Sequence, residues 1–146
     1  MIKLLAAVLL TASSLAAQVP VCMAVSEEDA RTLLGTTAKR MRDPSGCGWE
    51  DSEHKKELNV ARIGVAAMFD VARAESVKKG PTKDEDGLGG TAFSTISTGH
   101  KGSRAEIYLV KGSAVLIVTI NGFESGDAAQ HLPQMRDLVR KLVSKL

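Results

Sequence analysis

The sequence predicts an α+β fold: an antiparallel sheet of about five strands with flanking helices, of which the C-terminal helix packs on one face. Residues 104–109 alternate between polar and apolar side chains, as a half-buried strand does. Residues 114–120 return after a turn and are apolar on both sides, as expected of a covered central strand. Residues 132–146 carry a broad apolar stripe at helical spacing. Pro133 is unfavourable inside a helix, so the regular helix is predicted to begin near it or to bend there.

Two further helices are predicted from their end signals. Ser26 can cap a helix, and Asp29 stands where a capping box places an acidic or amide side chain. The apolar positions that follow end at Gly35, a natural helix stop. A second helical pattern begins at about Met68 and ends at Gly80, which is followed by a proline.

Three more strands complete the predicted sheet, at residues 47–49, 58–65 and 91–97. Residues 39–46 are basic and contain a proline, so they are predicted to be a connector. Residues 83–90 are charged and rich in glycine, so they are predicted to form a polar loop.

The first 16 residues have the three-part pattern of a secretory signal peptide. Lys3 is followed by a short apolar run and then by small residues, and cleavage is predicted after Ala16, with Ala17 as the alternative. The apolar run is shorter than the ~20 residues that span a bilayer, so the mature chain is expected to have no integral membrane segment. Residues 17–146 are then a single exported domain, periplasmic or secreted.

The charge balance argues against a nucleic-acid partner. Without Lys3 the chain carries 18 basic residues against 17 acidic ones, and aromatic residues make up only 3% of the sequence. A nucleic-acid interface needs a clustered basic face and often aromatic side chains on which bases stack. We expect a monomer whose partner is an envelope protein or a small ligand of unknown identity.

Cys22 and Cys47 are the two cysteines of the chain, and in an exported protein an even count favours a disulfide. A bridge across 25 positions would stabilise the fold by roughly 3 kcal/mol. The alternative is a metal site that includes His54, but the three residues lack the short paired spacing of zinc ligands. No metal or cofactor is assigned from the sequence.

Trp49 and His100 are the candidate binding residues. A tryptophan two positions after a disulfide cysteine can serve as a ligand platform, although such a residue more often packs in the core. His100 lies in a predicted loop between Gly99 and Lys101. The alternative function is a small hydrolase that uses loop residues near His100 and Asp86, but no catalytic residue is assigned.

Three short motifs resemble known sites without meeting their requirements. Residues 87–92 match a G-x-G-x-x-A phosphate loop, but a charged run precedes them and a strand follows. Residues 84–86 resemble part of a calcium loop that lacks its anchoring ligands. Ser76 and Lys79 fit the S-x-x-K pattern of serine acyl-enzymes, but the second motif of those enzymes is absent and Ser76 is expected on a polar helix face.

The chain carries five short segments in order, at residues 20–22, 26–35, 47–49, 87–92 and 110–112. Together they resemble a family of small bacterial exported domains, often lipoproteins, of unknown function. The resemblance implies a Cys22–Cys47 bridge and a twisted antiparallel sheet with flanking helices, similar to the PsbP/Mog1-like fold. The chain departs from the family because it lacks a lipid-attachment cysteine at the predicted cleavage point. The family implies no substrate, so the leading hypothesis is a non-enzymatic envelope protein that binds a partner or a small ligand.

Overall fold

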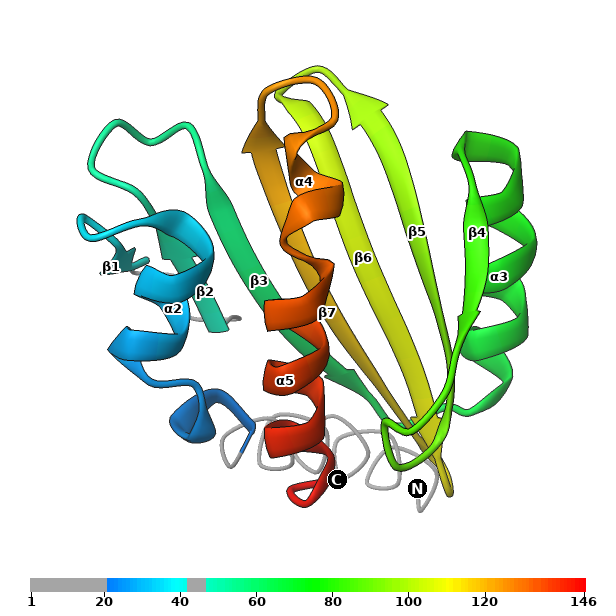
Figure 1. The fold of residues 1–146 in the computed structure, drawn as a ribbon. Helices are drawn as coiled ribbons and strands as arrows, with labels where there is room; N and C mark the ends of the chain where they lie inside the picture. Colours follow the sequence, from blue (N-terminus) through cyan, green and yellow to red (C-terminus); the bar gives the residue numbers. More distant parts are fainter. Residues whose placement is uncertain (1–20, 42–46) are drawn as a thin grey trace, which may run out of the picture.

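The computed structural model describes residues 21–41 and 47–146, and the predicted signal peptide lies outside them. These residues form one antiparallel seven-stranded sheet with helices on both faces (Figure 1). The strand order is β1-β2-β3-β7-β6-β5-β4. The α+β class, the antiparallel sheet and the C-terminal helix on one face are therefore confirmed. The strands are β1 (Lys39–Arg40), β2 (Cys47–Glu50), β3 (Glu57–Ile63), β4 (Thr82–Glu85), β5 (Thr91–Gly99), β6 (Gly102–Lys111) and β7 (Ala114–Phe123), and the helices are α2 (Glu27–Leu34), α3 (Ala67–Lys79), α4 (Asp127–Gln130) and α5 (Leu132–Val143).

The predicted hairpin is the centre of the sheet. β6 and β7 pair along nearly their whole length, and Ile107 lies opposite Val118. Gly112 occupies the turn between them with a φ of 59°, a left-handed conformation that glycine adopts without steric cost. The other side of β7 pairs with β3, so that Val60 lies opposite Val118. Two segments far apart in sequence thus become neighbours.

The front face, defined as the face of the sheet that carries Val60, Ile107 and Val118, holds the main core. α2, α4 and α5 lie across this face (Figure 1). The apolar stripe of α5 is buried against it, and each such side chain contributes about 1.5–3 kcal/mol relative to an exposed one. The stripe consists of Met135, Leu138, Val139 and Leu142.

The back face carries a smaller core beneath α3. Phe69 of α3 meets Phe93 edge to face, with ring centroids 5.2 Å apart, and Phe93 stacks on Tyr108 at 4.8 Å. α3 contacts β4, β5 and β6, so it covers only that part of the face. Ile117 of β7 and Ala61 of β3 remain only partly buried.

The expected number of about five strands is wrong, because two edge strands were predicted as a connector and a loop. β1 lies within residues 39–46, and β4 lies within residues 83–90 apart from its first residue. Both are short and charged, and they occupy the two outer edges of the sheet. Charged side chains on an edge strand discourage pairing with another chain, and they also remove the apolar alternation by which a strand is recognised.

The helix ends follow the predicted signals. The backbone N–H of Asp29 donates to the Ser26 hydroxyl at 3.1 Å, and the backbone N–H of Ser26 donates to the Asp29 carboxylate at 2.8 Å. At the other end of the chain, α4 stops before His131, and α5 begins with Pro133 in its first turn. Proline is tolerated there because first-turn N–H groups have no helical partner.

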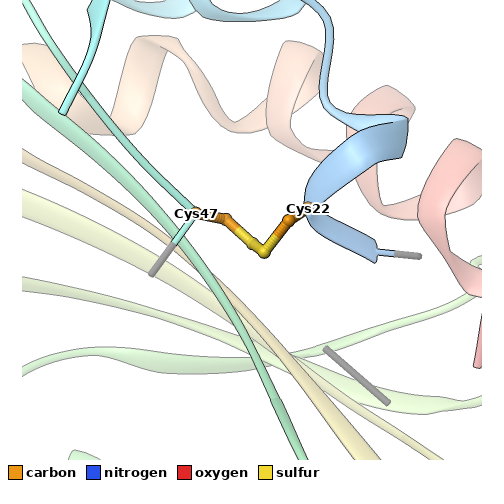
Figure 2. Close-up of a disulfide and its surroundings, with 2 residues drawn as sticks. All are labelled: Cys22 and Cys47. Carbon is orange, nitrogen blue, oxygen red and sulfur yellow. A yellow bond between two sulfur atoms is a disulfide. The ribbon is translucent and has the colours of Figure 1, made fainter. Parts of the chain in front are cut away.

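A disulfide joins Cys22 to Cys47, as predicted (Figure 2). Cys22 lies in a short helical turn before α2, and Cys47 is the first residue of β2. Their Cα atoms are 5.0 Å apart, within the usual range for a bridge. The disulfide therefore ties the segment that leads into α2 to the sheet. Within the described residues, no helix is long and apolar enough to cross a membrane.

Candidate functional site

His100 and Asp86 lie at opposite ends of β5. His100 is exposed in the turn between β5 and β6, whereas Asp86 directly follows β4, beside the first residues of β5. The intervening strand separates the two positions by about 25 Å, since an extended chain rises about 3.3 Å per residue. The structure therefore does not bring together the pair that the hydrolase hypothesis requires.

Trp49 packs in the core rather than lining an open site. It is 7% exposed, lies opposite Leu58 of β3 and belongs to the same buried cluster as Cys47. The guanidinium carbon of Arg40 stands 6.0 Å from the centroid of the indole ring. The ring thus presents little free surface, and its role as a ligand platform stays a prediction.

A polar hollow of about 350 Å³ lies on the back face, and the sequence did not single it out. It forms where the C-terminal end of α3 stands beside the last residues of β5 and the first half of β6. The antiparallel register places Ser97 directly opposite Arg104, which brings the two strands' contributions together. We call this hollow the back-face pocket; its lining residues are Lys79, Ser97, Thr98, Gly99, Arg104 and Glu106.

Glu106 is the most enclosed charged group of the pocket. Its side chain is 8% exposed, and its Oε1 accepts hydrogen bonds from Arg104 Nη2 at 2.6 Å and from the Tyr108 hydroxyl at 3.1 Å. Burial, followed by the negative charge of Glu106, raises the pKa of Tyr108 to about 12. The phenol therefore remains a protonated donor throughout the physiological pH range.

A row of buried polar side chains crosses the sheet beside the pocket. Thr95, Glu106 and Thr119 lie opposite one another on β5, β6 and β7, and all three are buried. Within the described part of the chain, Thr95 Oγ1 and Arg104 Nε are buried without a hydrogen-bond partner. An unsatisfied buried polar group costs about 1–3 kcal/mol, so such groups beside a hollow point to a functional role.

The S-x-x-K pair lies at the edge of the same pocket but is not arranged for acyl transfer. Ser76 is 4% exposed and faces the sheet, so the expected polar helix face is wrong for this residue. Both Ser76 and Lys79 lie in the last turn of α3, where the helix dipole is negative and disfavours a developing oxyanion. Lys79 nevertheless lines the pocket, and His100 follows a lining residue, Gly99.

A second hollow, of about 270 Å³, lies between α2 and α5. Lys141 Nζ binds Asp29 Oδ2 across it at 2.6 Å. Burial alone would raise the pKa of Asp29, but hydrogen bonds from Lys141 and Ser26 together lower it. These charges already satisfy one another and hold the two helices together, so the site has a structural explanation. We call it the helix groove; its lining residues are Asp29, Thr32, Leu33, Gln134, Asp137, Leu138 and Lys141.

The described residues contain no group of three or more His, Cys, Asp or Glu side chains placed to hold a metal ion. In particular, Cys47 is occupied by the disulfide and cannot act together with His54 as a ligand.

One weak signal for the back-face pocket is present in the amino-acid sequence. Arg104, Glu106 and Tyr108 form the polar side of an alternating strand, and such a side is normally expected to face solvent. Only the position of α3 turns this polar side into the wall of a hollow. This polar side can therefore be identified as part of a pocket only when the position of α3 on the sheet is known.

Comparison with family models and with curated proteins found no match to the chain.

Proposed function

We propose that the protein is an exported, non-enzymatic protein of the cell envelope and that it binds a small polar ligand in the back-face pocket. The observation that carries the proposal is the pocket itself, where charged side chains from α3 and β6 and the Ser97 hydroxyl of β5 surround one hollow. Ligand sites in proteins are concave and orient their ligands with a few polar groups.

The size of the pocket favours a small molecule over a protein partner. Its volume of about 350 Å³ lies at the lower end of the roughly 300–1,000 Å³ typical of ligand pockets. A protein partner would instead need a contact area on the order of 800 Å² on each side. The hollow suits a compact metabolite.

Two observations support the location. Residues 1–16 have the pattern of a secretory signal peptide, and the Cys22–Cys47 disulfide suits an oxidising compartment. A periplasmic or secreted location would account for both the signal-peptide pattern and the disulfide. A binding role also agrees with the separation of His100 from Asp86, which leaves the hydrolase hypothesis without a catalytic pair.

The experiment is a screen of small polar compounds against the folded protein, in which changes in the backbone amide signals of the NMR spectrum report binding. Ligands are expected to shift the amides of residues 97–99, Arg104 and Glu106. Replacing Ser97, which lines the pocket from the same face as Arg104, by tryptophan fills the hollow and should abolish these shifts. The matched control is Thr32→Trp, which places the same side chain in the helix groove and should leave the shifts unchanged.

The proposal fails if compounds shift only the amide signals of the helix-groove residues, or if no compound shifts the amide signals of the back-face pocket residues. It also fails if Ser97→Trp, still folded by its amide spectrum, binds the same compounds as the unchanged protein.

A further inference from the structure

We propose that the back-face pocket selects small organic monocarboxylates, whose single negative charge is held between Lys79 and Arg104. This inference rests on the proposed function of the pocket and adds the chemical class of the ligand.

The charge of the lining is the first argument. Two cations, Lys79 and Arg104, face one carboxylate, Glu106, which leaves one positive charge in excess. Glu106 is enclosed and bound by Arg104 at 2.6 Å, so its carboxylate is part of the site. A ligand with one negative charge neutralises the pocket.

Arg104 has donors left for a ligand. Its guanidinium carries five N–H groups, and the described contacts use Nη2, which binds Glu106. The side chain is 41% exposed, so part of the guanidinium remains open to the hollow. A planar guanidinium matches a carboxylate with two parallel hydrogen bonds, and the hydroxyl of Ser97, which lies opposite Arg104, adds a neutral donor.

Lys79 supplies the second cation. It is the last residue of α3, where the negative end of the helix dipole favours a positive charge. Its neighbour Lys78 binds Glu75 at 2.7 Å, whereas no carboxylate among the described residues pairs with Lys79. Lys79 is thus an exposed ammonium beside a hollow, and Lys78 is its natural control.

Glu106 sets the upper limit on ligand charge. A dianion such as phosphate near its second ionisation would meet the fixed carboxylate and leave the site with an excess negative charge. A cation would meet two positive side chains. The lining therefore favours one negative charge over two and over none.

The test uses the full folded protein and compares benzoate with benzamide, which has nearly the same shape without the charge. Benzoate is expected to shift the amides of residues 97–99, Arg104 and Glu106, and benzamide is expected to leave them in place. Inorganic phosphate is expected to bind more weakly than benzoate. The dissociation constants are measured by NMR titration at fixed ionic strength, because screening weakens such contacts.

Variants then assign the selectivity to individual charges. Lys79→Gln should weaken benzoate binding about fivefold, as expected for the loss of one partly solvated ion pair, and Lys78→Gln should have no effect. Arg104→Lys keeps the charge and should preserve the preference for benzoate over benzamide. Glu106→Gln keeps the shape of the side chain but removes the carboxylate, so the net charge of the lining becomes more positive. Phosphate binding should therefore strengthen relative to benzoate binding.

Equal binding of benzoate and benzamide, tighter binding of phosphate, no benzoate shift at all, or an unaffected Lys79→Gln variant would each overturn the inference. If neutral compounds bind in a way that Ser97→Trp abolishes, the proposed function survives and only the carboxylate class is wrong. If neither carboxylates nor neutral compounds shift the amide signals of the pocket residues, both the carboxylate class and the proposed function are wrong.

Discussion

Tyr108 packs its ring in the back-face core, and its hydroxyl donates a hydrogen bond to Glu106, which lines the pocket. The ring stacks on Phe93 at 4.8 Å, and the hydroxyl binds Glu106 at 3.1 Å. A tyrosine suits this position because its body is apolar and its tip is polar. The residue therefore links the packing of α3 on the sheet to the orientation of the carboxylate in the pocket.

Tyr108 is the single tyrosine of the chain, so its ionisation can be followed directly by the absorbance of tyrosinate. The pKa should be about 12 in the folded protein and near its ordinary value of about 10 in denaturant. Because the folded-state pKa is raised, the associated stability is fully present below the ordinary pKa and is lost as pH rises from about 10 to about 12.

Glu106→Gln serves as the control for the cause of this shift. Burial contributes most to the raised pKa, and Glu106 contributes next. The variant should therefore lower the pKa of Tyr108 only in part. A folded-state pKa near 10 in the unchanged protein would contradict the buried position of the phenol.

α5 and the edge strand β4 are joined by a buried ion pair on the front face. Arg136 of α5 donates two hydrogen bonds to Glu85 of β4, at 2.6 and 2.8 Å, and Ser94 donates a third at 2.7 Å. The Glu85 side chain is 5% exposed, and the Arg136 guanidinium is the main cause that lowers the pKa of this carboxyl. The pair anchors a charged strand that has little apolar surface of its own.

Arg136→Met should destabilise the protein by about 3–5 kcal/mol, because it leaves the Glu85 carboxylate buried and unpaired. The free energy of unfolding in urea measures the loss. Since the folded-state pKa of Glu85 is lowered, the stability from this pair is present above the ordinary carboxyl pKa. It is lost as pH falls through the folded-state value.

Arg140→Met is the matched control on the same helix. Arg140 pairs with Asp137 and donates a long hydrogen bond to the Gly87 carbonyl at 3.3 Å, and both contacts are exposed to solvent, so the loss should stay within about 0.5 kcal/mol. Equal losses for the two variants would show that the buried pair does not anchor β4.

At the scale of the molecule, residues 21–41 and 47–146 form a single sheet with helices on both faces, and a disulfide joins the segment before α2 to the sheet (Figures 1 and 2). The bridge holds the turn before α2 against β2, and α2 in turn packs on α5. Disulfides form and persist mainly in oxidising compartments, so the bridge agrees with the proposed exported location. The expected monomeric state stays a prediction.

Expression of the full chain in a bacterial host, followed by fractionation, tests the proposed location. The protein should appear in the periplasm or medium with its N-terminus after Ala16, and Cys22 and Cys47 should resist alkylation until a reductant is added. Reduction should lower the free energy of unfolding by roughly 3 kcal/mol, the value for a bridge of this span.

The control for fractionation is Leu9→Arg, which places a charge in the apolar run of the predicted signal peptide. This variant should stay in the cytoplasm with both thiols reactive. Cytoplasmic protein with free thiols in the unchanged chain would refute the exported location.

The sequence by itself determined the features that depend on local pattern or on simple counting. The α5 stripe, the β6–β7 hairpin and the Ser26 cap follow from residues that are close in the chain. The Cys22–Cys47 bridge followed because the chain has two cysteines.

The tertiary structure alone decided the edge strands and the back-face pocket. β1 and β4 are strands only because a neighbouring strand supplies their hydrogen bonds, and their charged side chains carry no apolar period. The pocket requires the register that sets Ser97 opposite Arg104 and the placement of α3 beside them. Such contacts between distant segments depend on how the elements pack, and no local pattern encodes that packing.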